Sequence, residues 1–217
     1  MLYIVSTPIG NLEDITLRAI DMLKKADLIA AEDTRHFQKL AIRYQIKTPT
    51  TSYHDHNKVQ KTPFLIEKLK AGKLVVLVSD AGTPGISDPG FYLIREAIRN
   101  NIPVTVIPGA SAIISALVLS GMPTDKFIFE GFLSHKHVAR QKRLAQLKEE
   151  KRTMIFYESP YRIPAFLEDV LEILGDRPIV CVRELTKKFE EVFRGSTADA
   201  LQHFQRNKPR GEFVVVI

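Results

Sequence analysis

The sequence predicts a two-domain α/β protein, with a parallel sheet in the N-terminal domain and a mixed sheet in the C-terminal domain. Short apolar runs alternate with amphipathic segments along the first half of the chain, which is the pattern of βα repetition. In the second half, the last apolar runs are joined by a short connection around Lys187 and Lys188, which favours antiparallel pairing. We expect the domains to cover residues 1–118 and 119–217.

Buried strands are expected in the N-terminal domain wherever a short apolar run is bounded by turn-forming residues. These runs are Tyr3–Ser6, Leu28–Ala31, Leu74–Val78 and Val104–Ile107. After the third run, Asp88 and Pro89 predict the start of a helix, because an N-cap carboxylate followed by proline is typical of that position.

The pattern of apolar runs restarts after Gly121, Pro123 and Asp125. The expected strands of the C-terminal domain are Phe127–Glu130, Thr153–Tyr157, Ile179–Arg183, Glu191–Arg194 and Glu212–Ile217. Leu167, Val170, Leu171 and Leu174 recur with the spacing of one helix face, and Gly175 predicts the end of that helix.

Composition restricts the compartment and the class of partner. The single cysteine, Cys181, excludes an internal disulfide and is typical of a reducing compartment. The first residues have no positively charged leader pattern, and the apolar stretch 102–122 is divided by prolines, so we expect a cytoplasmic protein without a membrane segment. The formal net charge of +6 favours an anionic partner.

Two stretches concentrate the basic residues. Lysines and arginines that neutralise phosphates supply much of the affinity of nucleic-acid-binding proteins, whereas a solvated helix face is the structural alternative. The first stretch contains Lys136, Arg140, Lys142, Arg143, Lys148, Lys151 and Arg152, and the second contains Arg206, Lys208 and Arg210.

Loops that follow the strands of the first half are the candidate ligand-binding segments. They begin TPIGNLEDIT at Thr7, AEDTRH at Ala31, SDAGTPGISDPG at Ser79 and PGASA at Pro108. In a parallel sheet all of them open at the same edge, where α/β proteins bind ligands. None matches GxGxxG or a P-loop with its lysine, so the loops favour a ligand with few charges over a nucleoside triphosphate.

Polar residues in these loops have both chemical and structural interpretations. Asp33 could accept a proton and Arg35 could bind a phosphate, while the alternative for this segment is helix capping. The triplet His54, Asp55 and His56 lacks an identified third metal ligand, so we expect no metal and place it in a loop near the substrate. Ser111 lacks the elbow motif of a hydrolase nucleophile.

In the second half, FYESPYR from Phe156 and RELTKKFEE from Arg183 place polar residues directly after buried strands. Strand ends of this kind are ligand-binding or substrate-binding positions. The structural alternative is salt bridging between the domains among Glu158, Arg162, Arg183 and Glu184.

Eight motifs occur in order along the chain, namely STPIGNLEDITLRA, EDTR, SDAGTPGISDPG, IPGASA, FEGFL, IFYESPYRI, RELTKKFEE and GEFVVVI. Together they resemble the tetrapyrrole methylase superfamily, and within it the family of ribosomal RNA small subunit methyltransferase I. The resemblance implies two α/β domains that bind S-adenosylmethionine between them, commonly as a homodimer. It implies methylation of a cytidine ribose 2'-hydroxyl in small-subunit ribosomal RNA, as naked RNA or in the assembled subunit.

Carried over motif by motif, the resemblance assigns residues to roles. The cofactor would contact Ile9, Asp80, Thr83, Pro84, Gly85, Ser111, Ala112, Tyr157, Leu185 and Glu212. The transfer needs a base for the hydroxyl proton, and the candidates are Asp33, ranked first, Glu184 and Lys188. RNA phosphates would contact Arg35, Lys136, Arg140 and Arg143.

Two other functions are compatible with the resemblance. The first is methylation of a carbon in a corrinoid or another tetrapyrrole. The second is a non-catalytic RNA-binding role in ribosome assembly that keeps the cofactor pocket. The basic segment from Lys136 and the EDTR and YESP motifs favour an RNA substrate over a tetrapyrrole.

Overall fold

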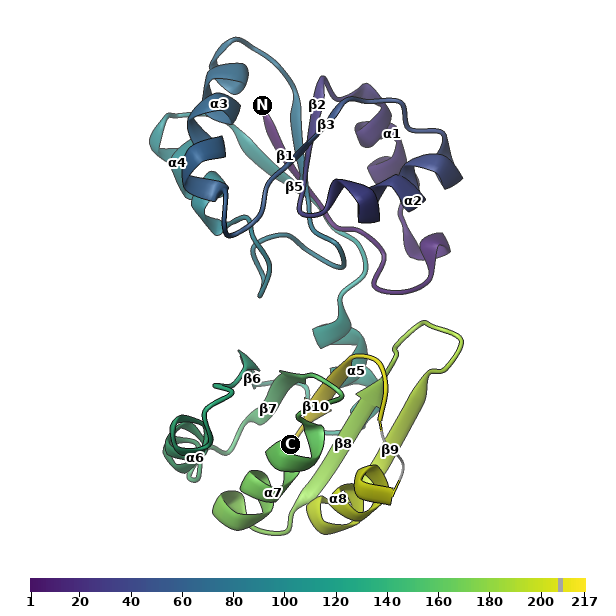
Figure 1. Ribbon diagram of the computed structural model, residues 1–217, viewed down its shortest axis with the longest axis vertical. Coiled ribbons are helices and arrows are strands. Elements are labelled where there is room, and N and C mark those ends of the chain that lie inside the picture. The colour runs from purple at the N-terminus through teal and green to yellow at the C-terminus, as the bar shows by residue number, and fades with distance from the viewer. Residues whose placement is uncertain (207–208) are drawn as a thin grey trace. The chain divides into compact units, whose positions relative to one another are not determined.

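Two α/β units, Met1–Ser111 and Ala112–Ile217, make up the protein in a computed structural model that describes residues 1–206 and 209–217 (Figure 1). The second unit begins at Ala112, whereas the sequence predicted a division at residue 118. The difference is helix α5 (Ala112–Ser120), which packs against strand β10 (Phe213–Val216) of the second unit. Lys208 of the second basic stretch lies outside the described residues.

The first unit is built on a five-stranded sheet in which every pair of neighbouring strands is parallel. This confirms the predicted parallel sheet and its apolar strands. The short polar segment Thr50–Ser52 was not predicted as a strand, because three polar residues carry no apolar pattern. The strand order is β3 (Thr50–Ser52), β2 (Leu28–Ala31), β4 (Val75–Val78), β1 (Leu2–Val5) and β5 (Val104–Ile107).

Helices cover both faces of this sheet, as Figure 1 shows. Successive residues of β4 point to opposite faces, so Val76 packs in one apolar cluster with Leu23 and Phe37, and Leu77 packs in another with Leu65 and Leu93. The 3-10 turn η1 (Leu12–Asp14) and helices α1 (Leu17–Lys25), α2 (Thr34–Tyr44), α3 (Lys58–Lys70) and α4 (Phe91–Arg99) complete the unit.

Helix α4 begins at Phe91, and its N-cap is Gly90. The predicted start at Asp88 and Pro89 is therefore wrong. Gly90 has a φ of +153°, and a Cβ there would lie 2.9 Å from the backbone nitrogen of Gly85. The chain turns sharply at this glycine, so Asp88 and Pro89 remain part of the preceding loop.

The second unit has a mixed five-stranded sheet, as predicted. Its first strand in sequence, Phe127–Phe132, pairs in parallel with the second, Thr153–Glu158, and all other neighbouring pairs are antiparallel. The strand order is β6 (Phe127–Phe132), β7 (Thr153–Glu158), β10 (Phe213–Val216), β8 (Pro178–Arg183) and β9 (Glu191–Ser196).

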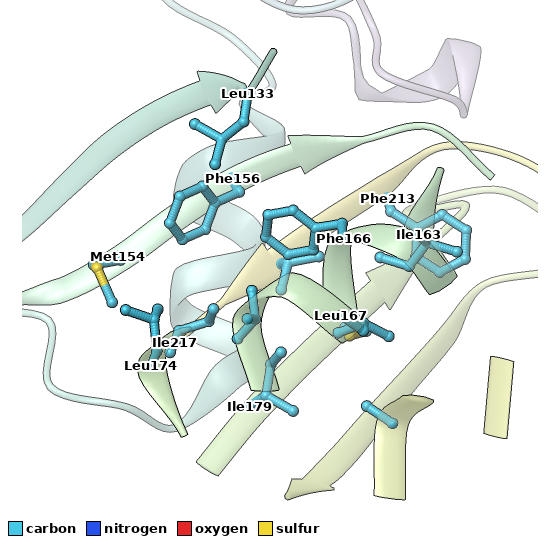
Figure 2. Packing of buried hydrophobic residues seen from close by; sticks show 14 of the residues in the cluster. Leu133, Met154, Phe156, Ile163, Phe166, Leu167, Leu174, Ile179, Phe213 and Ile217 are labelled. Atoms are coloured by element: carbon cyan, nitrogen blue, oxygen red, sulfur yellow. The ribbon is translucent and has the colours of Figure 1, made fainter. Parts of the chain in front are cut away.

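One apolar core joins this sheet to helices α6 (His137–Gln146), α7 (Ile163–Leu174) and α8 (Thr197–Arg206). Figure 2 shows Phe156 of β7 beside Phe166 of α7, with ring centroids 5.4 Å apart. Cys181 is buried in the same core, and burial raises the pKa of its thiol. Helix α7 ends at Leu174, and Gly175 follows with a φ of +82°, which confirms the predicted helix end.

A buried ion pair ties α6 to α7. The Arg140 guanidinium donates to the Asp169 carboxylate and to the carbonyl oxygen of Ala165, and Arg140 is only 5% exposed. His137 Nδ1 lies 3.0 Å from the other Asp169 oxygen. The structure therefore removes Arg140 from the predicted set of RNA-binding residues, because its charge is already neutralised inside the unit.

Among the described residues, no helix is both long enough and apolar enough to cross a membrane.

Replacing Asp169 by alanine would leave the buried Arg140 cation without its carboxylate. We expect Asp169→Ala to lower the free energy of unfolding by about 3–5 kcal/mol. Urea unfolding followed by far-ultraviolet circular dichroism measures this change. Glu172→Ala is the matched control, because Glu172 is an exposed α7 carboxylate that accepts a hydrogen bond from Gln141, and we expect a change within about 0.5 kcal/mol. Equal losses in the two variants would contradict the role of the pair.

Candidate functional site

The loops that leave β1, β2, β4 and β5 open at one edge of the first sheet, as the parallel pairing requires. This confirms the predicted arrangement. Strand β3 adds a fifth loop to the edge, which begins at Tyr53 and carries His54, Asp55 and His56. The sequence predicted a loop for that triplet but not this edge of the sheet, because the strand before it was not recognised.

The loop after β1 is bonded directly to the loop after β4. Thr7 and Gly82 exchange backbone hydrogen bonds, with N–O distances of 2.9 and 3.1 Å. The Thr7 hydroxyl donates to the carbonyl oxygen of Ser79 at 3.1 Å, and the hydroxyls of Ser6 and Thr83 lie 2.7 Å apart. Two of the predicted cofactor-binding segments, at Ile9 and at Thr83, are therefore held together by a fixed network.

A second link joins the loops after β2 and β4. The Asp33 amide donates to Asp80 Oδ1 at 3.1 Å, and the Asp80 amide donates to Glu32 Oε2 at 3.2 Å. Burial raises the pKa of Glu32, and the nearby carboxylates of Asp80 and Asp55 also raise it, while the amide hydrogen bond opposes them. The sequence did not predict this role of Glu32. Its position at a strand end beside Asp33 was the available signal.

Asp33 is the N-cap of α2, so the capping interpretation of this segment is confirmed. Its carboxylate accepts from the backbone amide of Arg35 at 2.8 Å and from the guanidinium at 3.0 and 3.2 Å. These hydrogen bonds lower the pKa of Asp33 to about 2. The Arg35 side chain remains 91% exposed, so it is accessible to a partner.

The His54 to His56 segment forms the approach to α3. Asn57 Oδ1 accepts from the His54 amide at 2.9 Å, and Asp55 pairs with Lys58 at 2.9 Å. The ring centroids of His54 and His56 are 6.0 Å apart. Within residues 1–206 and 209–217, the structure brings together no group of three histidine, cysteine or acidic side chains that could hold a metal ion.

Three predicted residues of the second unit lie along one edge of its sheet. Phe213 at the start of β10 pairs with Glu158 at the end of β7 and with Arg183 at the end of β8. Tyr157, Glu212 and the buried Leu185 that follows β8 therefore lie at the same end of the sheet. The Tyr157 ring contacts the rings of two phenylalanines of β6, Phe129 and Phe132, at centroid distances of 5.0 and 5.4 Å.

The segment after β8 is tightly bonded to the segment before β10. Glu184 and Glu212 are joined by two hydrogen bonds of 3.0 Å, and Lys187 Nζ lies 2.9 Å from both carboxylates. Burial raises the pKa of Glu184, but the hydrogen bonds from Lys187 and from the Glu212 amide outweigh it and lower the pKa. Glu184 and Thr186 both adopt left-handed backbone conformations, with φ values of +50° and +66°.

Lys188 is exposed, and its ammonium lies 5.7 Å from the centroid of the Phe189 ring. The structural alternative for these motifs was salt bridging between the domains, but Glu158 pairs with Arg162 inside the second unit, at 3.0 Å. Arg183 pairs with Glu191 instead, at 3.1 Å. All of these pairs lie within the second unit.

Two of the predicted RNA-binding cations of the second unit are at its surface. Lys136 is exposed at the N-cap of α6. Arg143 is 44% exposed, and its guanidinium forms two hydrogen bonds of 2.7 and 2.8 Å to Glu130. Helix α6 therefore presents cations to solvent on one side and anchors itself through Arg140 on the other.

Comparison with known proteins identifies the family. The model of the tetrapyrrole (corrin/porphyrin) methylases matches residues 1–201. Two relatives described as ribosomal RNA small subunit methyltransferase I align with 100% of the chain: one from Synechocystis at 53% identity, of which 78% is covered, and one from Thermotoga maritima at 49%, of which 97% is covered.

A solved structure shows the same fold. It is the uroporphyrin-III C-methyltransferase of Thermus thermophilus, complexed with S-adenosylhomocysteine, which aligns with a TM-score of 0.68 at 18% identity over 99% of this chain and 96% of its own. The extent of these matches, together with the two sheets described above, shows that the chain belongs to the tetrapyrrole methylases, and within them to the ribosomal RNA small subunit methyltransferase I family.

Proposed function

We propose that the protein is an S-adenosylmethionine-dependent methyltransferase that methylates the ribose 2'-hydroxyl of a cytidine in small-subunit ribosomal RNA. The observation that carries this proposal is the 49% identity to the Thermotoga relative over the whole of this chain and 97% of that one. We further propose that the enzyme acts in the cytoplasm as a homodimer, on the naked RNA or on the assembled subunit.

The chemistry of the first-unit loops fits this cofactor. The segments 7–16, 79–90 and 108–112 contain no lysine or arginine, as suits a nucleoside without phosphates. When bound, S-adenosylmethionine supplies an electrophilic methyl group on a positively charged sulfur. The residues proposed to hold it are Ile9, Asp80, Thr83, Pro84, Gly85, Ser111 and Ala112 of these loops, with Tyr157, Leu185 and Glu212 of the second unit.

The chain's own contribution to the reaction is mainly positioning. Methyl transfer needs the acceptor oxygen in line with the methyl group, and correct placement can supply a large part of the rate acceleration. The bonds of Asp80 with Glu32 and Asp33, and those of Thr7 with Gly82, fix the loops in one arrangement. Fixed loops support in-line placement because their geometry need not be organised when the substrates bind.

The proposed proton acceptors differ in how far they are already engaged. Asp33 caps α2 and binds Arg35, and its pKa of about 2 keeps it ionised but makes it a weak base. Glu184 is engaged with Lys187 and with the Glu212 amide, whereas Lys188 is exposed. Asp33 remains the first proposal, since a carboxylate at the cofactor edge can also orient the acceptor hydroxyl through a hydrogen bond.

The proposed activity predicts transfer of radiolabel from S-adenosylmethionine to small subunits that lack the modification. Because a 2'-O-methyl group blocks alkaline cleavage of the next phosphodiester bond, the label should appear in an alkali-resistant dinucleotide that contains cytidine. Naked ribosomal RNA and a corrinoid are assayed in parallel. Label on the corrinoid alone would show the tetrapyrrole reaction, and no label on any acceptor would show a non-catalytic protein.

Gly85→Val tests the loop after β4. Gly85 has a φ of +89°, and a Cβ there would make only ordinary contacts, the nearest at 3.5 Å to Ile94. The valine therefore acts through backbone strain of roughly 1–3 kcal/mol, which reshapes the loop. We expect S-adenosylmethionine affinity to fall at least about tenfold in calorimetry, with a near-native circular dichroism spectrum.

Gly72→Val is the matched control for this variant. Gly72 has a φ of +81° with nothing within 4 Å of its added Cβ, and it precedes β4, at the opposite edge of the sheet. It carries the same kind of strain without touching the loops, so cofactor affinity should be unchanged. If both glycine variants bound the cofactor like the wild type, the role assigned to Gly85 would be wrong.

The cations of α6 are tested by the salt dependence of RNA binding. Replacing Lys136 and Arg143 by glutamine should weaken binding and reduce the slope of log affinity against log salt by about 0.7 for each lost phosphate contact. Affinity for S-adenosylmethionine should not change. Arg99→Gln is the control, because Arg99 is an exposed arginine that pairs with a glutamate, as Arg143 does, but lies in the first unit. An unaltered slope would show that the α6 cations do not contact RNA phosphates and are only solvated surface residues.

A further inference from the structure

The second unit has a cavity of about 540 Å³ at one end of its helical layer. It lies where the segment before α7, the end of α8 and the segment before β10 meet. Its volume is within the range of roughly 300–1,000 Å³ that small-ligand sites occupy. The buried ring of Phe204 lines it, together with Pro160 and Pro164.

Tyr161 also lines the cavity, although the residue is 94% exposed. An aromatic ring so exposed adds almost nothing to the core, so the fold does not account for its presence. Pro160 directly before Tyr161 and Pro164 three residues after it restrict the nearby backbone. An exposed ring that lines a cavity is suited to stack against another flat group, and unpaired RNA bases are bound in this way.

The charge of the rim fits the same kind of ligand. Arg210 lines the cavity and is exposed, and Arg206 is exposed at the end of α8. In the part of the chain that the structure describes, neither arginine forms an ion pair. Both belong to the second basic stretch of the sequence. Neither the proposed cofactor binding nor the proposed RNA contacts of α6 involve them.

The cavity adjoins the proposed cofactor-binding residues of the second unit without including them. Gly211 lines it and precedes Glu212, which is bonded to Glu184. Tyr157, however, points to the face of the sheet opposite its neighbour Phe156, which packs under the helices. A ligand in this cavity, on the side of α7 and α8, would therefore be a different molecule or a different part of a molecule from the ligand beside Tyr157.

We propose that this cavity binds an unpaired nucleotide of the RNA substrate, next to the one that is methylated, with its base against the Tyr161 ring and its phosphate at Arg210. This inference rests on the proposed function and adds a binding site for the substrate. It assigns to Arg206 and Arg210 the task of holding the RNA substrate.

The test compares variants of the full-length enzyme in methyl transfer to unmodified small subunits. Tyr161→Ala should raise the KM for subunits on the order of tenfold, because loss of one base–aromatic stack has an effect of this size. The kcat and the KM for S-adenosylmethionine should be unchanged. Tyr161→Phe should keep the wild-type KM, since the ring is retained. Circular dichroism of all variants should match the wild type, as Tyr161 is exposed.

Arg210 is tested with a short fluorescein-labelled single-stranded RNA of mixed sequence. Arg210→Gln should lower its affinity and reduce the salt slope by about 0.7, whereas Arg210→Lys should restore the slope. Lys126→Gln is the control, because Lys126 is exposed just before β6, at the other edge of the same sheet. The same RNA carrying 4-thiouridine should crosslink to the peptide that contains Tyr161 in the wild type.

The outcomes separate this inference from the proposed function. If the wild type methylates subunits but Tyr161→Ala has an unchanged KM and the crosslink maps elsewhere, the cavity proposal is wrong and the function stands. If the KM for subunits rises while binding of the short RNA is unaffected by both substitutions, the cavity contacts a ribosomal protein, which also overturns the proposal. If the wild type transfers no methyl group, the function fails, and the RNA crosslink still decides whether the cavity binds RNA.

Discussion

The parallel pairing of β4 between β1 and β2 is the constraint on which the first unit depends. Because β4 is buried on both faces and runs parallel to both neighbours, its carboxyl end must open where theirs do. This brings three loops into bonding distance, and the hydrogen bonds of Thr7, Asp80 and Glu32 then lock them together. A reversed β4 would carry the SDAGTPGISDPG loop to the opposite edge, away from every partner that shapes it.

Local patterns in the sequence predicted most of the fold. The apolar strands, the mixed second sheet and the end of α7 at Gly175 follow from local composition and spacing. Strand β3 could not be predicted in this way, because its three polar residues are a strand only through pairing with β2. The start of α4 was misplaced because Asp88 and Pro89 have the local chemistry of a helix start, while contact of Gly90 with Gly85 decides the turn.

The sequence predicted which loops open at the edge of the candidate site, but it predicted less well what the charged residues do. Every strand-end loop proposed for the cofactor opens at the expected edge, since connectivity alone determines that result. Electrostatic roles depend on partners that are distant in sequence. Asp169 is 29 residues from Arg140, and Asp80 is 48 residues from Glu32, so no local pattern could show that one cation is buried or that one carboxylate joins two loops.

The burial of Arg140 has a mechanical consequence for recognition. Its guanidinium bonds both Asp169 and the carbonyl of Ala165, which is adjacent to Pro164 in the wall of the cavity. Arg140 thus ties the helix that carries the outer cations, α6, to the helix that carries Pro164 of the proposed nucleotide cavity, α7. Two weak contacts on a rigid frame reinforce each other only for a strand whose own shape spans them. Under this proposal, the buried arginine would set the separation between the two RNA contacts without binding RNA itself, and this separation would favour RNA of one conformation.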